Sequence, residues 1–282
     1  MTRVLIKTFD HFIDLLVSQK WQAKAARHTL NRILGEGDGD PENNGEYYLI
    51  ERVKEYYRNK ERFVAFDVGA NLGDWTAKAA GGMSSNWTIH AFEPSKETYW
   101  RLKEIETKRY IAKIKLYNLG LSDKDCSVDL YVCGEAAGTN SLYKRQAQAL
   151  GVKQESKEVI KLGKGDKFCY DRGIDHIDFI KIDTEGHELA VLNGFANMLS
   201  AGRIDMVQFE YGGCWVDART FLVDAFNYLL DKGYHVGKIY PRGVKVFTVY
   251  DQRLDNFVYC NYIAFKPGNE LIKKLTVREI GC

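Results

Sequence analysis

The sequence lacks three features that would place it in a specialised class of protein. Its apolar runs are strand-sized, far below the ~18 residues that a membrane span needs, so we expect no membrane span. With 40 Lys and Arg against 38 Asp and Glu, the net charge of +2 gives no support to a general nucleic-acid-binding surface. The 6 cysteines include no CxxC or other metal-ligand spacing, so we expect reduced thiols and a cytoplasmic protein.

One polar stretch divides the chain. "GEGDGDPENNGE", residues 35–46, is rich in Gly, Asp and Asn and predicts a loop. We therefore expect an N-terminal helical extension and loop over 1–46, followed by one catalytic domain over 47–282. A helix near the N-terminus would present one apolar face, made of Leu5, Phe9, Phe12, Ile13 and Leu16. This face either packs on the domain or joins two copies of the chain in a homodimer.

Beyond the loop, strand-like and helix-like segments alternate. "RFVAFDVG", "TIHAFEP", "IDFIKID" and "IDMVQFEY" read as strands, each followed by a helical pattern. This alternation predicts an α/β fold with a parallel sheet covered by helices on both faces. The chain closes with "YHVGKIY", "VKVFTVY" and "NFVYCNYIAF", which have no helix between them and so predict an antiparallel edge.

The first strand runs directly into a glycine loop, "DVGANLG". In an open α/β sheet, ligands bind outside the carboxyl ends of the strands, which is where this loop lies. Gly69 and Gly73 permit backbone angles and close approaches that a Cβ would forbid. A tight strand-to-helix turn with no ligand is the alternative explanation.

An acidic residue on the next strand favours a ligand. Glu93 follows the loop by about 20 residues, a spacing at which a carboxylate accepts both hydroxyls of a ribose. A dinucleotide would need G-x-G-x-x-G, whereas Gly69 to Gly73 lacks that spacing and has Asn71 inside it. S-adenosylmethionine carries a ribose but no phosphate. It needs a carboxylate near its ammonium group, a close-packed backbone and an acid on the ribose, and Asp67, the loop and Glu93 match these needs.

Five segments in the same order resemble the FkbM family of S-adenosylmethionine-dependent methyltransferases. They are "FDVGANLGDW", "HAFEPSKETYWRL", "LYNLGLSDKDCSVDLYV", "TNSL" and "IDFIKIDTEGHELAVLNG". The resemblance implies the class I methyltransferase fold, a Rossmann-like, mostly parallel seven-stranded sheet with an antiparallel C-terminal edge. It also implies O-methylation of a hydroxyl on a sugar, glycan or natural-product polyol.

The resemblance also implies roles for single residues. Asp67, Gly69, Asn71 and Gly73 correspond to the loop on the methionine side of the cofactor, and Glu93 to the ribose ligand. Leu121, Ser122 and Asp123 fall where the family has residues around the adenine. Gly163 in "LGKGDKF" departs from the pattern, since members often carry an acid there.

The acceptor side is expected at the next strand ends. "IKIDTEGHE" brings together Asp183, Glu185, His187 and Glu188, and "FEYGG" adds Glu210. An alcohol needs a base to remove its proton, and His187 is the first choice because its ordinary pKa lies near neutrality; Glu185 and Asp183 come next. The alternative is structural: Asp183 or Thr184 caps a helix, and Glu185 and Glu188 complement its positive end.

Several alternatives stay open from the sequence. Asp183 and Glu210 end adjacent strands and would suit Mg²⁺, although nothing in the sequence requires a metal. The polar, mildly basic stretch from Lys144 to Lys167 predicts a flap over the site. Methylation of nucleic acid or of another small molecule is a rival activity. A non-catalytic protein that binds S-adenosylmethionine and acts as a partner is a rival of another class.

Overall fold

The fold is taken from a computed structural model of the whole chain, which describes residues 18–134, 138–145, 154 and 156–277. A central sheet is the largest element, and its strands run in the order β10-β9-β11-β8-β7-β1-β2-β3. The strands are β1 (Phe63–Val68), β2 (Trp87–Phe92), β3 (Lys113–Tyr117), β7 (Ile177–Ile182), β8 (Ile204–Tyr211), β9 (His235–Tyr240), β10 (Gly243–Phe247) and β11 (Cys260–Phe265).

The central strands are apolar throughout because both faces of the sheet are covered. All six residues of β1 and of β7 are buried. β1, β2, β3, β7 and β8 pair in parallel, which is the arrangement that crossover helices produce. β11 then pairs antiparallel with both β8 and β9, and β10 pairs antiparallel with β9. The predicted fold class, with its antiparallel C-terminal edge, is confirmed; the sheet has eight strands rather than seven, because β10 adds an outer hairpin strand.

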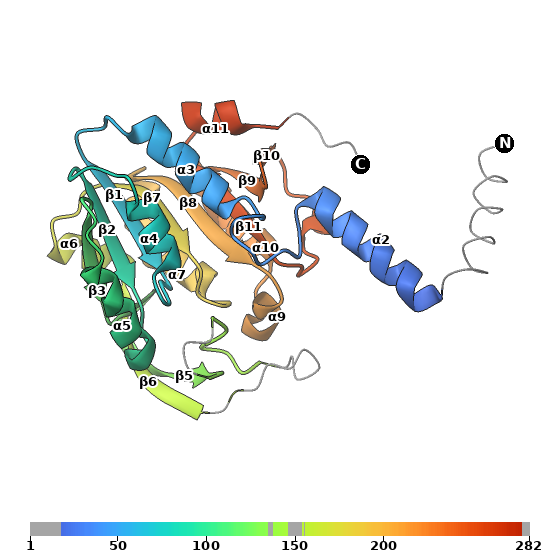
Figure 1. Cartoon of the computed structure of the whole chain (residues 1–282), viewed down its shortest axis with the longest axis horizontal. Coiled ribbons are helices and arrows are strands. Elements are labelled where there is room, and N and C mark those ends of the chain that lie inside the picture. Colours follow the sequence, from blue (N-terminus) through green and yellow to red (C-terminus); the bar gives the residue numbers. More distant parts are fainter. Residues whose placement is uncertain (1–17, 135–137, 146–153, 155, 278–282) are drawn as a thin grey trace.

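Helices cover the two faces in separate layers. One face packs against α6 (Gly165–Asp171), α7 (Glu188–Gly194), α8 (Ala196–Ser200) and α10 (Leu222–Asp231), through residues such as Phe168, Leu192 and Phe226. The other face packs against α3 (Glu46–Tyr57), α4 (Asp74–Ala80) and α11 (Glu270–Leu275), through residues such as Ile50, Ala79 and Ile272. Figure 1 views the side that α3 and α4 cover. Beside β2, α5 (Lys96–Leu102) and a 3-10 turn (Lys103–Thr107) pack on Ala70 and Ala91.

A second, small sheet stands beside the carboxyl ends of the central strands. It has the order β4-β6-β5, with β4 (Gly120–Ser122), β5 (Cys126–Val132) and β6 (Ser156–Lys164). Leu130, Ile160 and Leu162 form its own apolar cluster. Lysines that were predicted to belong to a flap, Lys157, Lys161 and Lys164, are instead part of β6, because β6 pairs with β5 over residues 156–162 and with β4 at Gly163 and Lys164.

The loop over 35–46 packs against the C-terminal strands. Glu36 forms a buried ion pair with Lys238 of β9, and Asn256 also donates to Glu36 at 3.0 Å. The backbone N–H of Gly37 donates to the carbonyl of Tyr259 at 2.7 Å. We propose that the catalytic unit includes this loop, so that the predicted boundary after residue 46 moves toward the N-terminus.

The helix before the loop lies apart from the body. α2 (Gln19–Leu34) buries none of its residues and extends away from the sheet in Figure 1. The apolar face predicted at Leu5 to Leu16 lies outside the described residues, so a homodimer contact through it stays a prediction. No helix in the described part of the chain is long and apolar enough to cross a membrane.

The Glu36–Lys238 pair offers a test of how the loop is held. We expect Lys238→Ala to lower the free energy of unfolding by about 3–5 kcal/mol, because it leaves a buried carboxylate without its cation. Urea denaturation measures this change. Lys245→Ala is the control, since Lys245 is the cross-strand partner of Lys238 on β10 but is only half-buried. Equal losses for the two variants would contradict the buried pair.

Candidate functional site

The glycine loop is pressed against the end of β7. Gly69 has φ +84, and a Cβ at this position would lie 1.8 Å from the carbonyl oxygen of Asp183. No side chain fits there, so glycine is required by both the backbone conformation and the close approach. The contact brings the loop after β1 next to the acidic segment after β7.

The backbone donors of the loop are already engaged within the protein. The N–H groups of Gly69 and Ala70 donate to the carbonyl of Phe92 at 3.0 and 2.9 Å, and that of Gly73 donates to Ala70 at 2.8 Å. The N–H of Asn71 donates to one carboxylate oxygen of Glu93 at 3.0 Å, while the N–H of Ser95 donates to the other at 2.8 Å. A phosphate cradle needs free amides, and the loop amides of Gly69, Ala70, Asn71 and Gly73 are not free.

A cavity of about 710 Å³ opens above the loop. Its volume is within the range of sites that bind small molecules and cofactors. Glu93 lies on its wall, and burial raises the pKa of this carboxyl to about 7. The small sheet and the segment after it supply an apolar part of the wall, made of Leu121, Leu130, Leu142, Ile160 and Leu162.

A buried lysine lies beneath the opposite, acidic part of the cavity. Lys181 donates to Asp183 at 2.9 Å and lies 3.9 Å from Asp67. Burial opposes ionisation of Asp183, but the Lys181 ammonium holds the pKa of Asp183 below its usual value. Asp67 is fully buried and accepts the Thr76 hydroxyl at 2.6 Å, so it supports Lys181 and α4 and does not line the cavity.

Glu185 and Glu210 add two acids to the same wall. Burial, followed by the charge of Asp183, raises the pKa of Glu185 to about 7 and that of Glu210 well above its ordinary value. Glu185, Glu210 and Cys214 have ligand atoms within 4.8 Å of one another. A buried thiol with a raised pKa differs from the oxygen ligands that Mg²⁺ prefers, and Asp183, predicted as a ligand, is turned to Lys181.

His187 lies on the cavity wall with both ring nitrogens in use. Nε2 is 2.9 Å from the Ser122 hydroxyl, and Nδ1 is 2.9 Å from the Tyr143 hydroxyl. Burial lowers the pKa of His187 to about 4, so the ring is neutral at neutral pH. The imidazole therefore links β4 to the segment above the cavity. This arrangement suits a structural role for His187 better than the role of a base.

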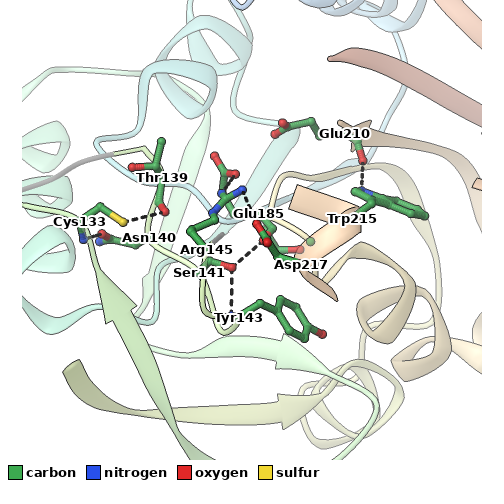
Figure 2. Close-up of polar contacts among 12 residues, drawn as sticks. Cys133, Thr139, Asn140, Ser141, Tyr143, Arg145, Glu185, Glu210, Trp215 and Asp217 are labelled. Atoms are coloured by element: carbon green, nitrogen blue, oxygen red, sulfur yellow. Dashed lines mark hydrogen bonds and ion pairs between the residues drawn. The ribbon is translucent and has the colours of Figure 1, made fainter. Parts of the chain in front are cut away.

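That segment, residues 138–145, is called the flap below. It overlaps the flap predicted from the sequence only at Lys144 and Arg145. Ser141 donates to the carbonyl of Glu185 at 2.7 Å, and Arg145 forms an ion pair with the Glu185 carboxylate (Figure 2). A second acid, Asp217 of α9 (Cys214–Ala218), lies 3.9 Å from Arg145. Arg145 and Asp217 escaped the sequence reasoning. The motif "TNSL" lies in this segment, but no sequence pattern indicates that Arg145, which follows it, lines the cavity.

The predicted cofactor residues are thus divided by the structure. Gly69, Asn71, Glu93 and Leu121 line the cavity, as do Asp183, Glu185 and His187 of the predicted catalytic group. Gly73 is instead covered by Leu102 and Ile105, where a larger residue would clash with the helix after β2. Ser122 contacts His187 and Asp123, at 2.9 and 3.0 Å, and neither Ser122 nor Asp123 is on the cavity wall.

The structural alternative for the acidic segment holds in part, for Glu188 in the first turn of α7. Its other part is wrong, because the N-cap of α7 is His187 and not Asp183 or Thr184. The Glu188 carboxylate accepts the backbone N–H groups of Thr184 and Gly186 at 2.8 and 3.0 Å. Glu188 is completely buried and shapes the turn before α7. Asp166 has a similar task at another turn, where it accepts the amides of Asn197 and Met198 at 2.9 and 3.0 Å.

Comparison with known proteins places the chain in a family. The model of the methyltransferase FkbM domain matches residues 67–236, from the glycine loop to the start of β9. The match covers more than half of the chain, and the chain belongs to this family of methyltransferases.

A curated relative is the hexuronic acid methyltransferase AglP of Haloferax volcanii. It is 29% identical over 167 residues, which are 59% of this chain; the chain spans 64% of the relative's length. Two solved structures are more distant. A precorrin-6y C5,15-methyltransferase from Geobacter metallireducens has a TM-score of 0.41 and 12% identity over 78% of this chain and 88% of its own. A SAM-dependent methyltransferase from Agrobacterium tumefaciens has a TM-score of 0.42 and 11% identity, over 82% of this chain and 64% of its own.

The environment of His187 leads to a measurable titration. We expect His187 to titrate near pH 4 in NMR spectra, assigned with the variant His187→Gln. The folded-state pKa lies below the unfolded value of 6.5, so protonation favours the unfolded chain. The contribution of His187 to stability is therefore lost as the pH falls from 6.5 towards 4. A titration at or above pH 6.5 would contradict burial of the ring between two hydroxyls.

Proposed function

We propose that the cavity binds S-adenosylmethionine and that the protein transfers its methyl group to a hydroxyl oxygen of a sugar, glycan or related polyol. The observation that carries the cofactor part is Glu93. Its carboxylate lies on the cavity wall, fixed by the amides of Asn71 and Ser95. Each oxygen accepts one backbone hydrogen bond and retains a lone pair for a ribose hydroxyl.

The remainder of the wall supports a phosphate-free, positively charged nucleoside. The apolar part around Leu121 and Leu162 suits a flat base such as adenine. The loop amides donate within the protein, which disfavours a pyrophosphate. The acidic part around Asp183 suits the ammonium and sulfonium groups, because opposite charges attract strongly in a partly buried site.

The acceptor part of the proposal has two supports. The chain belongs to the FkbM methyltransferase family, and a curated relative is named for methylation of a hexuronic acid. The wall beyond Asp183 is polar, with Glu185, Glu210 and Arg145, and such groups hydrogen-bond the hydroxyls of a sugar. We propose a hydroxyl as the receiving group.

When bound, the cofactor supplies an electrophilic methyl group on a positively charged sulfur. The protein must hold the acceptor hydroxyl and remove its proton. We propose Glu185 rather than His187 as the base. The pKa of Glu185 is raised to about 7, close to the working pH, and only its Oε2 is bonded to Arg145 among the described residues. His187 has both nitrogens occupied and a pKa of about 4, so it serves as a positioning residue.

Cofactor binding is expected to depend on pH through Glu93. Both ribose hydroxyls donate to an ionised carboxylate, and burial raises the pKa of Glu93 to about 7. Isothermal titration calorimetry should therefore show the Kd for S-adenosylmethionine rising up to about tenfold for each pH unit below 7. Glu93→Gln should weaken binding about 10- to 100-fold and flatten this pH dependence.

Glu97→Gln is the matched control, because Glu97 is an exposed acid on α5, 3.4 Å from Arg101. It should bind the cofactor as the unchanged protein does. Tight binding of NAD, or unaltered binding of S-adenosylmethionine by Glu93→Gln, would argue against the proposed cofactor site.

The base assignment is tested by turnover. We expect Glu185→Gln to lower kcat about 10²- to 10⁴-fold while it leaves the Kd for S-adenosylmethionine within a few-fold. In the unchanged protein kcat/KM should rise with pH up to about 7, as Glu185 loses its proton. The rate of S-adenosylhomocysteine release in the presence of a panel of monosaccharides measures kcat and kcat/KM. If His187→Gln were instead the variant without activity, and Glu185→Gln stayed active, the assignment would be wrong.

A further inference from the structure

The charges on the cavity wall are unequal, and this inequality bears on the acceptor. Among the described residues that line the cavity, five are acids: Glu93, Asp183, Glu185, Glu210 and Asp217. Arg145 is the only Lys or Arg in that set. Glu93 is assigned above to the ribose and Asp183 to the ammonium and sulfonium groups of the cofactor. This leaves Glu185, Glu210 and Asp217 around the place where the acceptor must enter.

Arg145 cannot cancel this excess, because its charge is already shared. Its guanidinium forms an ion pair with Glu185 and lies 3.9 Å from Asp217 (Figure 2). Both acids are largely buried, with 18% and 6% of their side chains exposed. A carboxylate or phosphate that took Arg145 as its partner would leave a buried acid without its counter-ion, which is strongly unfavourable.

A neutral group meets no such obstacle. The Nε–H of Arg145 is buried and has no hydrogen-bond partner among the described residues, although the Arg145 side chain is on the cavity wall. A buried donor without a partner is costly, and a sugar hydroxyl supplies an acceptor without adding charge. An amino group would gain from Glu185 and Asp217 in addition.

We propose that the acceptor is an uncharged or amine-bearing sugar and that Arg145, Glu185 and Asp217 select against sugars with a carboxylate or a phosphate near the reacting hydroxyl. This inference rests on the proposed function and narrows its substrate class. It separates this chain from its relative in Haloferax volcanii, which is named for a hexuronic acid. Arg145 binds a hydroxyl of the acceptor, and the two acids repel an anion that approaches the same guanidinium.

The test compares three monosaccharides that differ at one substituent: a neutral hexoside, its 2-amino analogue and its 6-carboxylate. Binding to the protein saturated with S-adenosylhomocysteine is measured by NMR saturation transfer, and methyl transfer by mass spectrometry. We expect kcat/KM for the neutral or amino sugar to exceed that for the carboxylate by about tenfold or more.

Asp217→Asn removes one of the two acids beside Arg145 and nearly keeps the volume. It should raise kcat/KM for the 6-carboxylate sugar and so reduce the ratio of kcat/KM values between the neutral and carboxylated sugars about three- to tenfold. Asp129→Asn is the control, because Asp129 pairs with Lys157 on the exposed surface of β5 and should leave the preference unchanged. Thermal melting of both variants checks that they are folded.

The inference is overturned if the carboxylated sugar is used as well as the neutral one, or if Asp217→Asn leaves the preference unaltered. If S-adenosylmethionine binds but none of the three sugars binds or is methylated, the inference also falls, while the cofactor part of the proposed function stands. If S-adenosylmethionine itself does not bind, both fall together.

Discussion

The site is organised around one buried cation, Lys181, that lies among more acids than it can neutralise. Lys181 pairs with Asp183 and lies near Asp67. Its single positive charge does not also neutralise Glu210, which faces Asp183. Burial makes this excess expensive, and the acids respond by keeping protons: the pKa values of Asp67, Glu185 and Glu210 are all raised. A ligand that brings positive charge would lower this cost further. The proposed cofactor and the proposed preference for an acceptor without negative charge both follow from this excess of acids.

Each of the two sheets forms a different part of the cavity wall. The central sheet brings acids to the carboxyl ends of β7 and β8, and the close approach of Gly69 to the Asp183 carbonyl joins them to the glycine loop. The small sheet supplies the apolar part of the wall, including Leu130 and Leu162. His187 connects the two regions, since it contacts Ser122 on β4 and Tyr143 in the flap. A neutral imidazole suits this task because protonation would turn its one accepting ring nitrogen into a donor and so disturb one of the two hydrogen bonds.

Much of the fold was predictable from the sequence, because the signals are local. Strand–helix alternation and buried apolar runs such as "FVAFDV" indicated the parallel sheet, and the closing strands indicated its antiparallel edge. The eighth strand was harder, because nothing local says that β10 pairs only with β9. The small sheet was missed for the same reason, because β5 and β6 pair residues that are 24 to 36 positions apart in the chain.

The site was predictable only where a motif reports a backbone requirement or a strand end. Gly69, Glu93 and Asp183 lie on the cavity wall, as their positions after strands indicated. Asp67 belongs to the same motif, but its side chain is buried beneath the loop and does not reach the cavity wall. Successive residues of a strand point to opposite faces of the sheet, so a motif does not show which of its side chains face the ligand. Arg145 and Asp217 could not be found, because their roles arise from a contact between the flap and α9 that no spacing in the sequence encodes.

The most direct test of the account is a crystal structure of the protein with S-adenosylhomocysteine. We expect the two ribose hydroxyls on the carboxylate of Glu93, the adenine against Leu121 and Leu162, and the amino group on the side of Asp183. A ligand found elsewhere, or a cavity that stays empty at saturating ligand because the flap fills it, would contradict the central claim.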